Sequence, residues 1–121
     1  MENLQLNLAF EKGEELLRIA QDELCRPEED VVPYMVYEKA KLATAEFLIS
    51  FLTHYGIQVF SIDPEVLLNQ CREVNNGFYE LNITALINVG KDDNAWVNLA
   101  SAKDFVTIAE NTRAMVISQI G

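Results

Sequence analysis

The chain has 121 residues, half of them hydrophobic, and a net charge of −10 at pH 7. This length suits one domain covering residues 1–121, and the hydrophobic content excludes a disordered chain. The negative charge argues against binding to nucleic acid or to an anionic membrane surface, because both need clusters of Lys and Arg. No segment would span a bilayer and the first residues lack a signal-peptide pattern, so we expect a cytoplasmic protein.

A first helix is predicted from Asn3 to Leu24. Its apolar positions recur at alternating steps of four and three: Leu6, Phe10, Gly13, Leu17, Ala20 and Leu24. Glycine weakens a helix, so Gly13 on this stripe predicts close approach by a neighbouring helix. Pro27 ends the helix, and Asp30 is the predicted N-cap of the next one.

The second helix is predicted from Pro33 to Tyr55, with Gly56 as the residue that terminates it. One apolar face consists of Val36, Ala40, Ala43, Phe47, Phe51 and His54. A second face consists of Leu42, Ala45, Ile49 and Leu52, flanked by Leu48. A narrow polar strip separates them: Lys39, Glu46, Ser50 and Thr53. A helix with two apolar faces must bury both, so the second face meets either further helices or a second copy of the chain.

The apolar segment 57–62 is expected to lie across the end of the bundle. A third helix then begins at Asp63-Pro64-Glu65, which combines an N-cap acid, a proline in the first position and an acid in the first turn. Its apolar positions are Leu67, Cys71, Val74 and Phe78. Asn75-Asn-Gly77 ends or kinks it.

Residues Tyr79–Asp93 alternate in hydrophobicity as a strand would, at Leu81, Ile83, Ala85, Ile87 and Val89. A lone strand has no partner in a helical chain, so we expect an irregular segment that crosses the bundle. The last helix begins between Asp93 and Ser101, where Ser101–Asp104 resembles a capping box. Its apolar positions are Ala102, Phe105, Ala109, Thr112, Val116 and Ile120. The predicted fold is therefore all-α: an antiparallel up-and-down bundle of four main helices with an irregular crossing segment before the last.

The sequence carries few of the residues that catalysis or metal binding requires. His54 is the single histidine, the two cysteines lack zinc-site spacing, and there is no phosphate-binding loop. Cys25 and Cys71 are predicted to be buried, reduced thiols. A Cys71–His54 nucleophile pair is disfavoured, because apolar surroundings raise the pKa of a thiol and make it inert. We therefore predict a non-enzymatic protein without a cofactor or metal.

Glu46 is the most informative polar residue, because a carboxylate beside Leu42 and Ile49 should be part-buried and needs a partner. Lys39, Arg72 and Arg113 are the candidate partners. The favoured interpretation is an ion pair that fixes helix register. The alternative is a ligand-binding pocket formed by Glu46, Arg72 and Arg113.

The pattern Tyr37-x-x-Ala40-x-x-Ala43-x-Ala45-Glu46-x-Leu48 resembles the second helix of the HEPN domain, a small helical bundle. The order and lengths of the predicted helices are similar too, and residues 26–34 look like the loop of a bacterial subgroup of such bundles. The chain departs from the ribonuclease members of the family. Arg113 has no His four to six residues after it, and Asp63-Pro64 replaces a frequent His. Ser50 stands where a lysine is often found.

The resemblance therefore implies the non-catalytic role of the family and not its nuclease activity. Such members act as partners or substrate-binding subunits beside nucleotidyltransferases, and many form dimers. We accordingly expect a homodimeric interaction module with a protein or small-ligand partner. Two alternatives stay open: a nucleotide or small-ligand site around Glu46, Arg72 and Arg113, and an acidic, antitoxin-like module for a basic protein.

Overall fold

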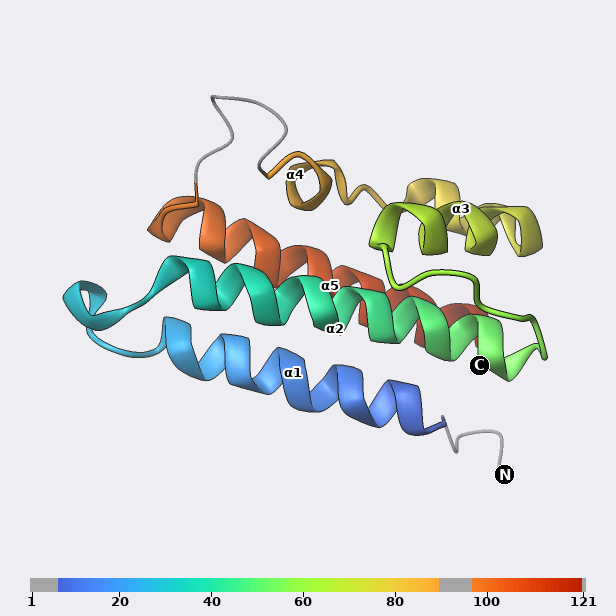
Figure 1. The fold of residues 1–121 in the computed structure, drawn as a ribbon, viewed down its shortest axis with the longest axis horizontal. Coiled ribbons are helices and arrows are strands. Elements are labelled where there is room, and N and C mark those ends of the chain that lie inside the picture. Colours follow the sequence, from blue (N-terminus) through green and yellow to red (C-terminus); the bar gives the residue numbers. More distant parts are fainter. Residues whose placement is uncertain (1–6, 90–96, 121) are drawn as a thin grey trace.

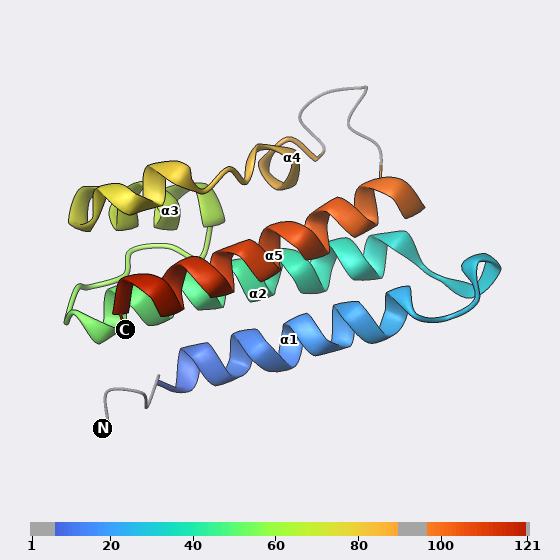
Figure 2. The same ribbon diagram turned by 180° about the vertical axis from the view of Figure 1, so that it is seen from behind.

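The computed structural model describes residues 7–89 and 97–120. Its helices are α1 (Leu8–Leu24), α2 (Pro33–His54), α3 (Pro64–Val74), α4 (Thr84–Ile87) and α5 (Leu99–Ile120), with the 3-10 turns η2 (Glu28–Asp30) and η3 (Asn76–Glu80). This part of the chain contains no strand, so the all-α prediction is confirmed. In Figure 1 the long helices α1, α2 and α5 lie together, with α3 and α4 on the side of the α2–α5 pair away from α1; Figure 2 shows the same from behind.

Helix α2 is the central element of the bundle, because aromatic rings from its neighbours pack on it from several directions. Phe10 of α1 lies against Phe47, with ring centroids 5.1 Å apart. The ring centroids of Phe51 and of Phe78 in η3 are 4.6 Å apart. Such tilted and edge-on ring pairs add specific geometry to the burial of apolar area. The stripe of small and large residues along α2 therefore joins the layers into one core.

The direction of α3 differs from a simple up-and-down order, whereas those of α1 and α5 agree with it. Helix α1 runs antiparallel to α2, as predicted, so that Asn7 at its start donates to the Ser50 carbonyl near the end of α2 at 3.0 Å. Helix α5 runs parallel to α2, as the last of four up-and-down helices does, but α3 also runs parallel to α2 (Figures 1 and 2). Tyr37 meets Phe105 near the start of both helices, at 5.2 Å between ring centroids. Near the other end, the Tyr55 hydroxyl donates to the Gln119 carbonyl at 3.3 Å.

The segment between α2 and α3 accounts for the direction of α3. Residues 56–63 turn back along α2 instead of lying only across the end of the bundle, so α3 starts beside the middle of α2 and runs parallel to it (Figure 1). Ile57 and Val59 pack on the core. Phe60 and Ile62, however, are 75% and 73% exposed, so this apolar segment covers less of the bundle than its composition predicts.

The role of Gly13 follows the prediction, but α1 begins at Leu8 and not at the predicted Asn3, because Asn7 is an extended N-cap residue. Asn7 caps the helix, and its side chain accepts from the Phe10 N–H at 3.2 Å. The predicted first turn, residues 3–6, lies outside the described residues. A Cβ atom on Gly13 would lie 2.7 Å from the Phe47 ring, closer than two carbon atoms can pack. The glycine is therefore what lets α1 and α2 approach.

The start of α2 corrects one prediction, because Asp30 is not its N-cap. Asp30 belongs to η2, and Val32 occupies the cap position without a capping side chain of its own. Instead, the buried carboxylate of Glu23 at the end of α1 accepts from the Val32 N–H at 2.9 Å and from Arg26 at 3.0 Å. The acid that stabilises this helix start is supplied by the preceding helix.

The two faces of α2 are covered to different extents. Val36, Ala40, Ala43, Phe47 and Phe51 of the first face are fully buried, whereas His54 is exposed. On the second face, Ala45, Leu48 and Leu52 are buried, and Leu42 is 44% exposed. The Cys71 thiol of α3 lies 3.7 Å from the Leu48 carbonyl oxygen. Much of the second face is thus closed by the chain's own α3, and the part around Leu42 stays open.

Of two further predicted polar positions, Ser50 is buried, whereas Asp63 has its predicted role as an N-cap. Ser50 of the predicted polar strip is buried and donates to the Phe47 carbonyl at 2.6 Å. Asp63 caps α3 by accepting from the Glu65 N–H at 3.0 Å, as predicted.

In the crossing segment Leu81 and Ile83 are buried, but the short helix α4 then changes the period of buried residues. Leu86 is therefore buried in place of the predicted neighbours Ala85 and Ile87.

Helix α5 begins earlier than the predicted capping box. Asn98 and Ser101 form a reciprocal pair in which each backbone N–H donates to the other side chain at 2.9 Å. This is the capping-box arrangement, three residues before the predicted Ser101–Asp104. The apolar positions predicted on α5 are buried from Ala102 to Val116, and Ile120 is partly buried.

Candidate functional site

Glu46 has an ion-pair partner that the sequence did not suggest. Its carboxylate lies 3.7 Å from the Lys12 ammonium of α1, and the two side chains are 21% and 63% exposed. Lys39, Arg72 and Arg113 form no ion pair with it among the described residues. A long pair with an exposed lysine contributes little to stability. Glu46 joins α1 to α2, and lines none of the cavities described below.

Arg72 holds a turn together. Its guanidinium donates to the Phe78 carbonyl at 3.3 Å and to the Leu81 carbonyl at 3.1 Å, and lies 5.0 Å from the centre of the Tyr79 ring. These contacts satisfy one backbone carbonyl within η3 and one directly after it. Arg72 also lines a hollow of about 390 Å³ between α3 and α4.

Arg113 lies on the other side of the bundle, between α5 and α1. Two of its nitrogen atoms donate to one Glu14 carboxylate oxygen, at 3.0 and 2.7 Å, and its guanidinium lies 5.6 Å from the centre of the Phe10 ring. The three predicted site residues therefore have separate partners, and no single cavity contains them.

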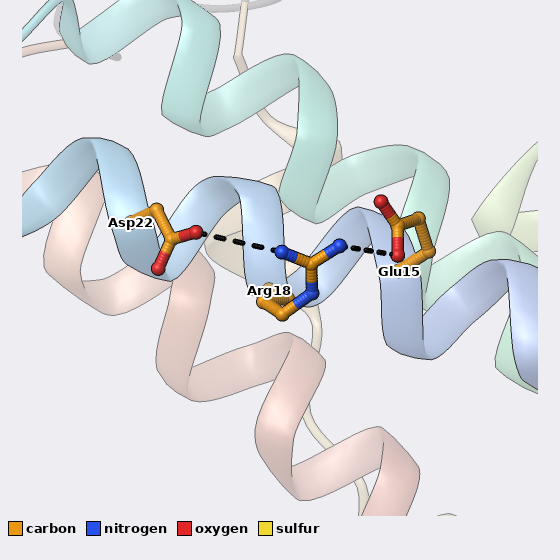
Figure 3. A network of polar contacts seen from close by, with 3 residues as sticks. All are labelled: Glu15, Arg18 and Asp22. Atoms are coloured by element: carbon orange, nitrogen blue, oxygen red, sulfur yellow. Dashed lines mark hydrogen bonds and ion pairs between the residues drawn. The ribbon is translucent and has the colours of Figure 1, made fainter.

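The hollow lined by Arg113, which we call the α1–α5 hollow, has a volume of about 660 Å³ and four glutamates on its wall: Glu11, Glu14, Glu15 and Glu110. Most of the charged side chains of this hollow already have an ion-pair or hydrogen-bond partner within the protein. Arg18 lies between Glu15, at 2.5 Å, and Asp22, at 3.7 Å, along α1 (Figure 3). The hydrogen bond that Arg18 donates to Glu15, together with the negative charge of Glu15, raises the pKa of Arg18. Arginine is charged at any physiological pH, so this network neutralises surface charge and moves no proton.

The thiols and the histidine do not form a nucleophilic pair. Cys71 is buried, as predicted, and desolvation raises its pKa from 9.0 to about 12. Cys25 is exposed, contrary to the prediction. His54 is exposed at the end of α2 with its ring edge-on to Tyr55, at 4.9 Å between centroids. A buried neutral thiol cannot act as a nucleophile through a solvent-exposed imidazole.

Among residues 7–89 and 97–120, no three His, Cys, Asp or Glu side chains gather in a way that could hold a metal ion. None of the helices in that same part of the chain is both long and apolar enough to cross a membrane.

The cavity with the composition of a binding site lies elsewhere, along the first half of α2. This cavity, which we call the α2–α4 groove, has a volume of about 620 Å³ and lies between α2, the start of α3 and α4. Its apolar lining is formed by Tyr34, Tyr37, Leu42, Ala45, Ile62, Pro64, Leu86, Ile87 and Val89. Ligand sites are typically concave and mainly apolar with a few polar groups, and this volume lies in their usual range.

The position of the groove follows from the path of the chain. Residues 56–63 bring Ile62 and Pro64 to the side of Leu42, and α4 brings Ile87 from the opposite wall. Leu42 and Ile62 keep much of their surface exposed, at 44% and 73%. The open part of the second face of α2 is therefore one wall of this groove.

Two tyrosine rings and one lysine ammonium group add polar atoms at defined positions to the groove. The Tyr34 and Tyr37 rings are tilted against each other, with centroids 5.4 Å apart. The Lys41 ammonium lies 5.8 Å from the centre of the Tyr37 ring. Sequence reasoning missed this site, although Tyr34, Tyr37 and Leu42 at helical spacing were visible, because its other walls come from residues 61–64 and 86–89, in later segments of the chain.

The chain matches no protein-family model, and no curated protein or solved structure was found to be similar to it. The HEPN resemblance consequently stays a prediction based on the residues of the second helix.

Proposed function

We propose that the protein is a non-catalytic helical binding module whose α2–α4 groove takes an apolar group of its ligand. The observation that supports this proposal is the exposed apolar surface of Leu42 and Ile62 inside a concave site. Burying a side chain of that size is worth about 1.5–3 kcal/mol, so a ligand that covers both gains affinity directly. The non-catalytic part of the proposal is supported by the inert surroundings of Cys71.

A neutral fluorescent probe, N-phenyl-1-naphthylamine, tests the groove, because its emission rises in an apolar site. We expect saturable binding to the folded protein. Leu42→Asn and Ile62→Asn should each weaken it about ten-fold, from the loss of roughly 1.4 kcal/mol or more of apolar contact.

Ile117→Asn on α5 is the control matched to Leu42, because Ile117 is 38% exposed, against 44% for Leu42, and lies outside the groove. Its probe affinity should equal that of the unchanged protein. Absence of saturable binding, or equal weakening by the α5 variant, would overturn the proposed site.

We also propose the homodimer that the family resemblance implies. Since α3 closes much of the second face of α2, Phe60 on the 56–63 segment, at 75% exposure, is the better candidate contact. Sedimentation equilibrium should show a dimer that Phe60→Ser weakens. A monomer at high protein concentration would remove the dimer from the proposal and leave the groove in place.

A further inference from the structure

Two lysines of the α2–α4 groove lack the carboxylate partner that four of the six other cations in the described part of the chain have. Lys12, Arg18, Arg26 and Arg113 each lie within 4 Å of a carboxylate. Lys39 and Lys41 line the groove and form no ion pair with any described residue. The chain holds 19 acidic and nine basic residues. In such an acidic protein, two ammonium groups that line the same apolar cavity without an ion pair are candidate contacts for a ligand.

The acidic groups of the groove are less available than its lysines. Asp63 accepts from the Glu65 N–H at 3.0 Å as the cap of α3, and its own N–H donates to Ser61 at 2.9 Å. A carboxylate at a helix N-terminus is already stabilised by the helix dipole. Glu38 lines the groove and has no ion pair in the described part of the chain. The groove lining thus carries the positive charges of Lys39 and Lys41, the negative charge of Glu38, and the negative charge of Asp63, which the start of α3 partly offsets.

Local charge decides what the groove attracts, although the whole protein is negative. At physiological ionic strength charges are screened beyond about 8 Å, so distant glutamates act weakly on a ligand in the groove. An ammonium group has three donors and no acceptor, and a carboxylate is an acceptor that matches it. Lys41 lies over the Tyr37 ring, which places its charge beside the aromatic lining.

Building on the proposed function, we infer that the α2–α4 groove selects an amphipathic carboxylate. The apolar chain or ring of this ligand lies against Leu42 and Ile62, and its carboxylate accepts hydrogen bonds from Lys39 and Lys41. Glu38 opposes the bound anion. Selectivity comes from the lysines, whereas affinity for the apolar body comes from the groove itself.

Displacement of bound N-phenyl-1-naphthylamine by three ten-carbon compounds tests the inference, each below its micelle concentration in 0.15 M salt. Decanoate should displace the probe at lower concentration than 1-decanol, and decylamine should be the weakest. Lys39→Gln and Lys41→Gln should each weaken decanoate about two- to five-fold, the range that an exposed ion pair supplies. Neither should change the affinity for decanol.

Two further variants make the experiment specific. Glu38→Gln should strengthen decanoate and weaken decylamine, since it removes the opposing charge. Lys103→Gln, an exposed lysine on α5 outside the groove, should leave all three affinities unchanged. Raising the salt concentration should weaken decanoate and not decanol.

The outcomes separate this inference from the function on which it rests. If the probe binds and the three compounds displace it equally, or if the Lys103 variant weakens decanoate as much as the groove variants, the carboxylate selectivity is wrong and the groove stands. If the probe does not bind at all, the proposed function itself fails.

Discussion

The two halves of α2 are similar in composition but differ in what covers them. The second half is enclosed: Phe47, Leu48, Phe51 and Leu52 have no exposed surface. Along the first half, Leu42 remains 44% exposed and lines the α2–α4 groove. The difference arises outside α2, because α3 starts only beside the middle of the helix. Hydrophobic sequence alone therefore does not tell core from binding surface; the path of the connecting segments decides.

The largest expected effect is on stability and compares two leucines of the same helix. Leu48→Ala should lower the free energy of unfolding by about 2–5 kcal/mol, since it leaves a cavity in the closed half. Leu42→Ala should cost about 1 kcal/mol or less, because the side chain is already partly hydrated. Urea denaturation of both variants measures the difference. Equal costs would mean that the groove is filled by the protein itself.

The second prediction concerns the two thiols. Cys71 packs against the closed half of α2, where burial raises its pKa to about 12, whereas Cys25 is exposed. At pH 8 a rise from 9.0 to about 12 reduces the thiolate of Cys71 about 1,000-fold. A Cys25→Ser variant should therefore react with a thiol reagent only on unfolding, and a Cys71→Ser variant should react at once.

The same pKa change predicts how stability depends on pH. Between pH 9 and about 12 the folded thiol keeps its proton while the unfolded thiol loses it. The folded state then binds more protons, so the contribution of Cys71 to stability falls as pH rises through this window. Comparing the pH dependence of Cys71→Ser with that of the unchanged protein isolates this contribution; parallel curves would contradict the raised pKa.

The smallest expected effect is at Glu46, on the boundary between the two halves. Glu46→Gln should change the free energy of unfolding by less than about 0.5 kcal/mol, because Lys12 is 63% exposed and 3.7 Å away. Glu14→Gln is the comparison, since it removes the closer pair with Arg113 at 2.7 Å, and should cost up to about 1 kcal/mol. A larger effect at Glu46 than at Glu14 would support the predicted role of Glu46 as the residue that fixes helix register.

The features predicted well from sequence are those set by neighbours in the chain. Asp63-Pro64-Glu65 starts α3 by local hydrogen bonding, and Gly56 ends α2 with a φ of 72°, which favours glycine. The close approach at Gly13 was also predictable, because a glycine on an apolar helix stripe weakens the helix but leaves room for a side chain of the neighbouring one.

The features that were missed depend on contacts between distant segments. Glu23 stabilises the start of α2 from nine residues before it, and nothing in the local pattern distinguishes it from other surface glutamates. The direction of α3, parallel to α2, depends on how residues 56–63 turn back. The groove was missed for the same reason, because its walls come from segments that are distant in the chain. A site formed by Glu46, Arg72 and Arg113 was predicted from their residue types alone. In the structure each of the three has its own partner.

The parallel arrangement of α2 and α5 has a practical consequence for experiments with tethered protein. Asn7 contacts Ser50, and Gln119 contacts Tyr55, so the chain enters and leaves the described bundle at the end of α2 remote from Tyr34 and the groove. An affinity tag, fluorophore or surface linker would join the described bundle at the end remote from the proposed ligand site. Immobilised protein should therefore retain access to its groove whichever end carries the attachment.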